Sequence, residues 1–198
     1  RVVVECGGCA GEAGSGARGA GRCRRRHAAR SQVTGPSGRA CHRVKESEAL
    51  DYIAGYTLIN DVSARNWVPG VHAAQGVFGP IHAWEHNILG KQFPTFCPMG
   101  PTLATRDEIA DPGKVNITTT LNGKVMQSAC TDDLVFGLRE LIAYYSQFYR
   151  FRPGDVISTG TPSGVGFGRK PQVFMQPGDV VAITVKEIGT LSNPVAAA

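Results

Sequence analysis

The sequence lacks the long apolar segments that membrane insertion and secretion require. None of its 198 residues belongs to a run that approaches the roughly 18 consecutive apolar residues of a membrane-spanning helix. Its first residues also lack the apolar core of a secretory signal peptide. We therefore expect no membrane partner and a cytoplasmic location.

Core-forming side chains are also missing from the first forty residues, which contain no Leu, Ile, Met, Phe, Tyr or Trp. This stretch holds eight Arg, nine Gly and seven Ala but only two Glu, and so carries a formal charge of +6. The rest of the chain has 13 basic and 14 acidic side chains and is close to neutral. Because such a composition cannot fill a hydrophobic core, we divide the chain into a Gly/Arg/Ala-rich segment, residues 1–37, and one domain over residues 38–198.

Residues 1–37 allow several interpretations. They form a disordered arm, or they follow an altered reading frame, because Arg, Gly and Ala dominate when GC-rich DNA is translated out of frame. An Arg-rich arm also binds nucleic acid in some proteins, but no aromatic residue is interleaved here to stack on bases, so we do not expect a nucleic-acid partner. An Arg-rich, acid-poor leader is also typical of mitochondrial targeting, although the Leu and Phe of an amphipathic face are absent.

Cysteine is present at six positions but forms no convincing metal or disulfide pattern. Cys6 and Cys9 have a C-x-x-C spacing, yet nothing between Cys9 and Cys41 supplies apolar residues that would pack on a zinc ion. Disulfides are not expected, because Cys97 and Cys130 fall within a domain whose sequence is typical of an intracellular enzyme.

The pattern of apolar residues over 38–198 predicts more strand than helix. Helical periodicity covers 46–54 and 134–145, and strand patterns cover 55–59, 115–121, 124–128, 155–159 and 180–187, with a short closing strand near 190. Asn122-Gly123 predicts a type I′ hairpin turn, and DVIST at 155–159 predicts a buried strand. The stretch 67–90 predicts a long loop with one short helical piece near 83–87. We expect a β-rich α+β domain.

Three places carry residue types suited to chemistry. Asp61 follows an apolar strand, where a carboxylate can hold a hard cation, although an Asp there is often a turn or helix cap. Lys91 ends the long loop, where an ammonium can stabilise an enolate, or can form an ordinary surface salt bridge. Gly160 and Thr161 open a Gly-rich loop whose N–H groups can hold an anion, or which is simply a tight exit from a strand.

Four segments together, GYTLINDVSARNW, GKQFPTFCPMGP, LNGKV and FRPGDVISTGTPSGVG, resemble the C-terminal catalytic domain of the fumarylacetoacetate hydrolase family. The resemblance runs from about Gly38 to Val195. It implies a mixed β-roll of the fumarylacetoacetase C-terminal type, a homodimer, and Mg²⁺ or Mn²⁺, with Ca²⁺ as an alternative. It also implies a small-molecule 2-oxo or β-diketo acid as substrate.

The implied activity is that of a metal-dependent C–C bond hydrolase or lyase. Acylpyruvates or fumarylacetoacetate-type acids would be cleaved through a metal-bound enolate. Two alternatives stay open: an oxaloacetate decarboxylase or 2-hydroxyhepta-2,4-diene-1,7-dioate isomerase of aromatic catabolism, and a catalytically impaired member that serves as a dimeric binding module.

The resemblance also assigns residues. Asp61 matches the family's metal-binding Asp, Lys91 matches the catalytic Lys beside the substrate carbonyl, and Thr161, with Gly160, matches the group that holds the substrate carboxylate. Arg65 matches the Arg of the same motif as Asp61 and is assigned to the substrate site, where it would also orient the Asp61 loop.

The chain departs from the family pattern at three places. The two metal-binding glutamates of an E-x-E strand are missing, because the corresponding SQVTGPS contains no acid, so the domain is incomplete on its N-terminal side. The His–Glu pair with which hydrolytic members activate water is also missing. Val68 replaces a substrate-contacting Gln, and Gln75, His82, Glu85 and His86 in the longer loop are the residues that could compensate.

Overall fold

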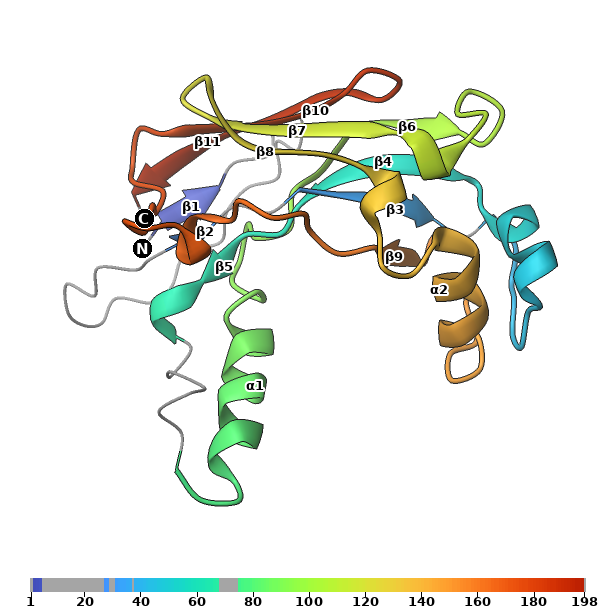
Figure 1. The fold of residues 1–198 in the computed structure, drawn as a ribbon, viewed down its shortest axis with the longest axis horizontal. Coiled ribbons are helices and arrows are strands. Elements are labelled where there is room, and N and C mark those ends of the chain that lie inside the picture. The colour runs from blue at the N-terminus through green and yellow to red at the C-terminus, as the bar shows by residue number, and fades with distance from the viewer. Residues whose placement is uncertain (1, 5–26, 29–30, 37, 68–74, 198) are drawn as a thin grey trace.

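The computed structural model describes residues 2–4, 27–28, 31–36, 38–67 and 75–197. Within these ranges no helix is long and apolar enough to span a membrane. The strand pairs among the described residues are all antiparallel and form three sheets (Figure 1). The structure is α+β with more strand than helix, as the sequence predicts.

The largest sheet has five strands in the order β1-β11-β10-β7-β8. These are β1 (Val2–Val4), β7 (Asn116–Leu121), β8 (Lys124–Cys130), β10 (Val180–Val185) and β11 (Gly189–Ala197). The predicted hairpin is confirmed, because β7 and β8 are joined by Asn122 and Gly123 with φ angles of 51° and 78°, which are those of a type I′ turn.

A second sheet has four strands in the order β6-β4-β3-β9. Asp61 directly follows the last residue of its strand β4. Its strands are β3 (Ser31–Pro36), β4 (Gly55–Asn60), β6 (Met99–Thr105) and β9 (Val156–Ser158). A short ladder of β2 (His27–Ala28) and β5 (Ser63–Ala64) keeps the register of the β3–β4 pair. Strands from before residue 38 therefore take part in the sheets.

The helices are short and lie outside the sheets. They are α1 (Gly79–Leu89) and α2 (Leu138–Tyr145), with 3-10 turns η1 (Glu46–Tyr52), η2 (Arg65–Trp67), η4 (Pro112–Lys114), η5 (Thr131–Asp133) and η6 (Gly166–Gly168). In Figure 1, α1 extends away from the sheets.

Four elements differ from the sequence predictions, each for a physical reason. The helical piece expected near 83–87 begins at Gly79, because Pro80 is tolerated in a first helical turn. The helix expected from residue 134 begins only at Leu138, after an extended Gly137. The strand expected to be buried, β9, is an edge strand with only Ile157 half-buried. The closing strand β11 is nine residues long, because it pairs with both β10 and β1.

The main hydrophobic core joins the two larger sheets. Tyr56 and Leu58 of β4 are fully buried and belong to one cluster with Ile183 of β10 and Ile142 of α2. All six residues of β4 are buried. Because β4 is held on both faces, the position at which it ends is fixed, and this end is where Asp61 stands.

Candidate active site

Asp61 stands in a tight, well-anchored turn between β4 and β5. The backbone N–H of Asn60 donates to the carbonyl of Pro98 at 3.0 Å, and the N–H of Val62 donates back to the carbonyl of Asn60 at 2.8 Å. The buried Asn60 side chain donates through Nδ2 to Oδ1 of Asn193 at 3.1 Å, which ties this turn to β11. The sequence therefore places a carboxylate at a rigid strand end.

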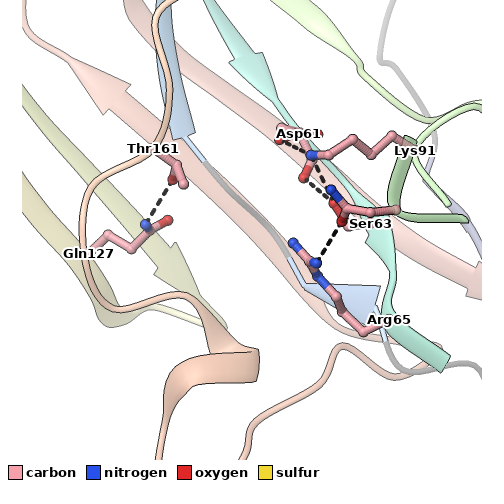
Figure 2. A network of polar contacts seen from close by, with 7 residues as sticks. Asp61, Ser63, Arg65, Lys91, Gln127 and Thr161 are labelled. Carbon is pink, nitrogen blue, oxygen red and sulfur yellow. Dashed lines mark hydrogen bonds and ion pairs between the residues drawn. The ribbon is translucent and has the colours of Figure 1, made fainter. Parts of the chain in front are cut away.

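Lys91 contacts this carboxylate directly. Its Nζ forms an ion pair with Oδ2 of Asp61 and donates to Oγ of Ser63 at 3.2 Å (Figure 2). The Lys91 and Asp61 side chains are only 27% and 16% exposed, so this is not the surface salt bridge that the sequence alone leaves open. The pair joins the end of a strand to a residue thirty positions further along the chain.

The backbone next to Lys91 is also anchored. The carbonyl of Gly90 accepts a hydrogen bond of 2.8 Å from the N–H of Ala64 on β5, and Gly90 is buried. A Cβ at residue 90 would lie 3.1 Å from the carbonyl oxygen of His86 and 3.2 Å from that of Ala64. The close packing of α1's end against β5 thus sets where the Lys91 side chain begins.

Cys97 lies near the same pair and shows how the local charges act. Cys97 is an exposed residue, but partial desolvation of its thiol raises the pKa, the Asp61 carboxylate raises it further, and the Lys91 ammonium lowers it. With a raised pKa the thiol stays protonated at neutral pH and is a poor nucleophile. Covalent catalysis through this cysteine is therefore not supported.

Arg65 follows Ser63 on the same segment and presents an unused edge. Its Nη1 donates to Oδ1 of Asn87 on α1 at 2.9 Å, and its Cζ lies 5.6 Å from the centre of the Phe167 ring. Its Nε and Nη2 are buried and have no hydrogen-bond partner among the described residues. Because a buried guanidinium edge without an acceptor is costly, this edge is suited to an anionic oxygen.

Thr161 and Gly160 belong to a second group, which Figure 2 shows apart from Asp61 and Lys91. Oγ1 of Thr161 accepts from Nε2 of Gln127 at 3.1 Å, and the same Nε2 donates to the carbonyl of Pro162 at 2.8 Å. Since Oγ1 is the acceptor, the Thr161 hydroxyl keeps its own hydrogen for another partner. Gly160 has a φ of 104°, which only glycine adopts without strain.

Hydrogen bonds from Arg169 hold the Gly-rich loop after β9 against β8. Nε of Arg169 donates to the carbonyl of Gly164 at 3.0 Å, and Nη2 of the same side chain donates to the carbonyl of Met126. A Cβ at residue 164 would lie 2.3 Å from that Met126 oxygen. Gln127 and Arg169 were not predicted as site residues from the sequence. The only signal for Gln127 is that it is a polar residue in an alternating strand, at a position that is buried.

Replacing Gly166 with Ala should destabilise this loop. A Cβ there would lie 1.9 Å from the carbonyl oxygen of Val173, so the backbone has to shift, at a cost of about 1–3 kcal/mol. The nearby Gly168→Ala is the matched control, because its Cβ meets nothing closer than 3.6 Å. Urea unfolding of both variants checks this, and equal midpoints would contradict it.

A cavity of about 330 Å³ lies on the Thr161 side. It is bounded by the 159–163 loop, by β7 and β8, and by the segment from Thr131 to Phe136. Asp61 and Lys91 do not line it. The predicted site residues are therefore brought together in two groups: Asp61, Lys91 and the neighbouring Arg65 in one, and Gly160 with Thr161 in the other.

The residues proposed to compensate for the missing groups are placed differently. Nδ1 of His82 and Oε2 of Glu85 form a pair at 3.1 Å on the exposed surface of α1. His86 is half-buried, its ring centre 6.1 Å from that of Trp67, and Gln75 is exposed. Val68, Cys6, Cys9 and Cys23 lie outside the described residues, and Cys41 and Cys130 are free thiols.

The donor set at Asp61 does not suit a divalent metal ion. In the described parts of the chain, no three His, Cys, Asp or Glu side chains lie close enough together to hold one. Asp61 is joined instead to a cation, Lys91. By sequence, no Asp or Glu occurs between Glu12 and Glu46, the stretch that includes β2 and β3. One carboxylate beside an ammonium does not fit Mg²⁺ or Mn²⁺, which are held by several oxygen ligands.

Comparison with known proteins gives consistent results. Residues 36–196 match the model of the fumarylacetoacetate hydrolase C-terminal domain. The human mitochondrial oxaloacetate tautomerase FAHD2B is 44% identical over 158 residues, which cover 80% of this chain and 47% of that protein. The chain thus spans about half the length of the curated relatives it matches.

Solved structures agree with the fold. The fumarylacetoacetate hydrolase of Exiguobacterium antarcticum superposes with a TM-score of 0.76 at 32% identity, over 87% of this chain and 57% of that one. Maleylpyruvate hydrolase of Sphingobium sp. SYK-6, solved with manganese and pyruvate, gives a TM-score of 0.70 at 27% identity, over 85% and 53%. The expected fold class is confirmed, and the chain belongs to the fumarylacetoacetate hydrolase family.

Proposed function

We propose that this chain binds a 2-oxo acid beside Asp61 and Lys91 and catalyses its keto–enol tautomerisation. The observation that carries the proposal is the direct contact between the Asp61 carboxylate, which stands at a rigid strand end, and the Lys91 ammonium, with both side chains largely shielded from solvent. Named relatives support this class of reaction, since the human protein at 44% identity is an oxaloacetate tautomerase. This proposal places the chain among the family's isomerase-type alternatives.

The chemistry needs only proton transfers. Asp61 removes a proton from the carbon next to the 2-oxo group, so that a C–H bond breaks and the carboxylate becomes an acid. The Lys91 ammonium stabilises the enolate oxygen and gives it a proton, which forms the O–H bond of the enol. The acid and the amine then exchange a proton through their direct contact, and the starting charges are restored.

Other groups of the site would position the substrate. The free edge of Arg65, Nε and Nη2, suits a bidentate contact with a carboxylate. The Thr161 hydroxyl, whose oxygen already accepts from Gln127, has its hydrogen available for a second anionic oxygen. We keep these as the proposed substrate-binding residues, with Gly160 allowing the backbone to approach.

Hydrolysis is the less favoured alternative, because it needs a base that activates water. In the described residues the one His–Glu ion pair, His82 with Glu85, is exposed on α1. Decarboxylation needs no added water and stays the closer competitor. A catalytically impaired binding module is the remaining alternative.

The assay that tests the proposal uses the purified 198-residue chain and oxaloacetate. Loss of the enol's ultraviolet absorbance reports tautomerisation, and pyruvate formed in parallel, measured with lactate dehydrogenase, reports decarboxylation. Acylpyruvate cleavage reports hydrolysis. Faster ketonisation without pyruvate supports the proposal, whereas no change over the buffer rate would overturn it and favour the binding module.

Lys91→Met should lower kcat by about 10²-fold or more, because the enolate oxygen loses its cation and the proton circuit is broken. Lys91→Arg should retain part of the activity, since it keeps the charge. The matched control is Lys114→Met, which removes an exposed lysine whose Nζ lies 3.6 Å from Oδ2 of Asp111. A Lys91→Met enzyme as active as the control would contradict the assigned role.

We also propose a homodimer and a mitochondrial location. The dimer is the assembly that family membership implies, and light scattering on the purified chain tests it. The location follows the relatives that are named as mitochondrial, and import of the full-length protein into isolated mitochondria tests it.

A further inference from the structure

We infer that the Lys91 ammonium takes the place of the divalent cation at this site, so that the chain binds an anionic 2-oxo-acid-type ligand without a metal. The inference rests on the proposed function only for the class of ligand. Its structural basis is independent: the contacts of Lys91, the count of carboxylates, and the arrangement of the neighbouring strands.

Few carboxylates surround Lys91. Among the described residues, Asp61 is the only acid in contact with Lys91. The strands that run beside its turn, β2 and β3, pair with β5 and β4 in one continuous register. Their sequence from His27 to Pro36 contains neither Asp nor Glu. The neighbouring strand therefore adds no charged oxygen where a metal ion would need one.

The Lys91 ammonium is fixed in its position by hydrogen bonds. Nζ is bonded to Oδ2 of Asp61 and to Oγ of Ser63, and the backbone before Lys91 is fixed by the hydrogen bond from Ala64 to Gly90. A divalent ion on the same Asp61 oxygen would meet a like charge at close range. Moving the ammonium away would break two hydrogen bonds and leave a partly buried cation without its counterion.

The ammonium also has capacity for a ligand. A lysine has three N–H donors, and Asp61 and Ser63 take two of them among the described residues. The third can reach an anionic oxygen, as a metal ion would. The unused Nε and Nη2 edge of Arg65, two residues beyond Ser63, adds a second cationic donor on the same segment. Lys91 and Arg65 thus supply positive charge at the site without a bound metal ion.

The test uses the full chain, freed of metal with a chelator, and oxalate as probe. Oxalate presents two anionic oxygens in the arrangement of a 2-oxo acid's enolate and undergoes no turnover. Calorimetry should show oxalate binding with the same Kd, within about twofold, in chelator and in 1 mM Mn²⁺, and a separate Mn²⁺ titration should show no saturable site. Lys91→Met should weaken oxalate binding at least tenfold, whereas Lys91→Arg, which keeps the cation, should retain most of it.

The outcomes separate this inference from the proposed function. Saturable micromolar Mn²⁺ binding that Asp61→Asn abolishes would overturn the inference, whether or not the chain tautomerises oxaloacetate. Oxalate binding that requires Mn²⁺, or no oxalate binding under either condition, would overturn it too. Metal-independent oxalate binding without turnover would uphold it while the proposed function fails. Circular dichroism of both Lys91 variants identifies any loss that comes from misfolding.

Discussion

Replacing Asp61 with Asn is expected to lower kcat for tautomerisation by about 10²- to 10⁴-fold, the range typical of a lost general base. The amide has nearly the same shape as the carboxylate, so the tight turn between Asn60 and Val62 should remain intact. It cannot take up the substrate proton, however, and it no longer balances the charge of Lys91. We expect the loss mainly in kcat, because the proposed substrate contacts at Arg65 and Thr161 are unchanged.

Asp111→Asn is the matched control for this experiment. Asp111 also pairs with a lysine, Lys114, at 3.6 Å, but its side chain is exposed and serves as the cap of η4 through the N–H of Gly113. Its replacement should leave kcat unchanged. If Asp61→Asn keeps more than a tenth of the parent activity, Asp61 is not the base and the proton path proposed above is wrong.

Leu58→Ala should lower the free energy of unfolding by about 2–5 kcal/mol, the usual cost of a leucine-sized cavity in a core. Leu58 is 0% exposed on the central strand β4, where it packs in the same cluster as Tyr56 and Ile183. The cavity would open three residues before Asp61, so activity should fall at temperatures where the fold is still populated. Denaturant unfolding, followed by circular dichroism, measures the change.

Leu103→Ala makes the same chemical change one strand away and serves as the control. Leu103 lies on β6, which pairs with β4, but its side chain is 47% exposed. It should cost less than about 1 kcal/mol, because little apolar area leaves the core. Equal losses in the two variants would show that β4 is not the centre of the hydrophobic core.

The sequence predicted best those elements whose signals are local. Asn122-Gly123 determines its hairpin by itself, because few other residue pairs adopt two consecutive positive φ angles. The prediction from sequence was wrong where burial depends on neighbouring strands. The apolar run around Ile157 has the pattern of a buried strand, but its place at the edge of the sheet leaves it half-exposed. Periodicity cannot indicate which strand ends a sheet.

The residues of the site could be predicted from local motifs, but the contacts between them could not. Asp61 and Lys91 stand in recognisable motifs, and family resemblance selected them. Their direct contact joins residues thirty positions apart, and no local pattern reports it. The bond from Arg65 to Asn87 depends on α1, whose helical piece near 83–87 was predicted, but no local pattern indicates that this helix packs beside Arg65. The support of Thr161 by Gln127 likewise needs β8 to lie under the Gly-rich loop.

The bond between Asn60 and Asn193 has a consequence for how the protein is made. It connects the turn that holds Asp61 to a strand near the end of the sequence, and β3 likewise joins β4 to β9. Contacts between such distant segments require large loops to close and make folding slow. During synthesis the turn with Asp61 leaves the ribosome long before the partners that anchor it. The turn therefore gains its Asn193 anchor only after that residue has left the ribosome.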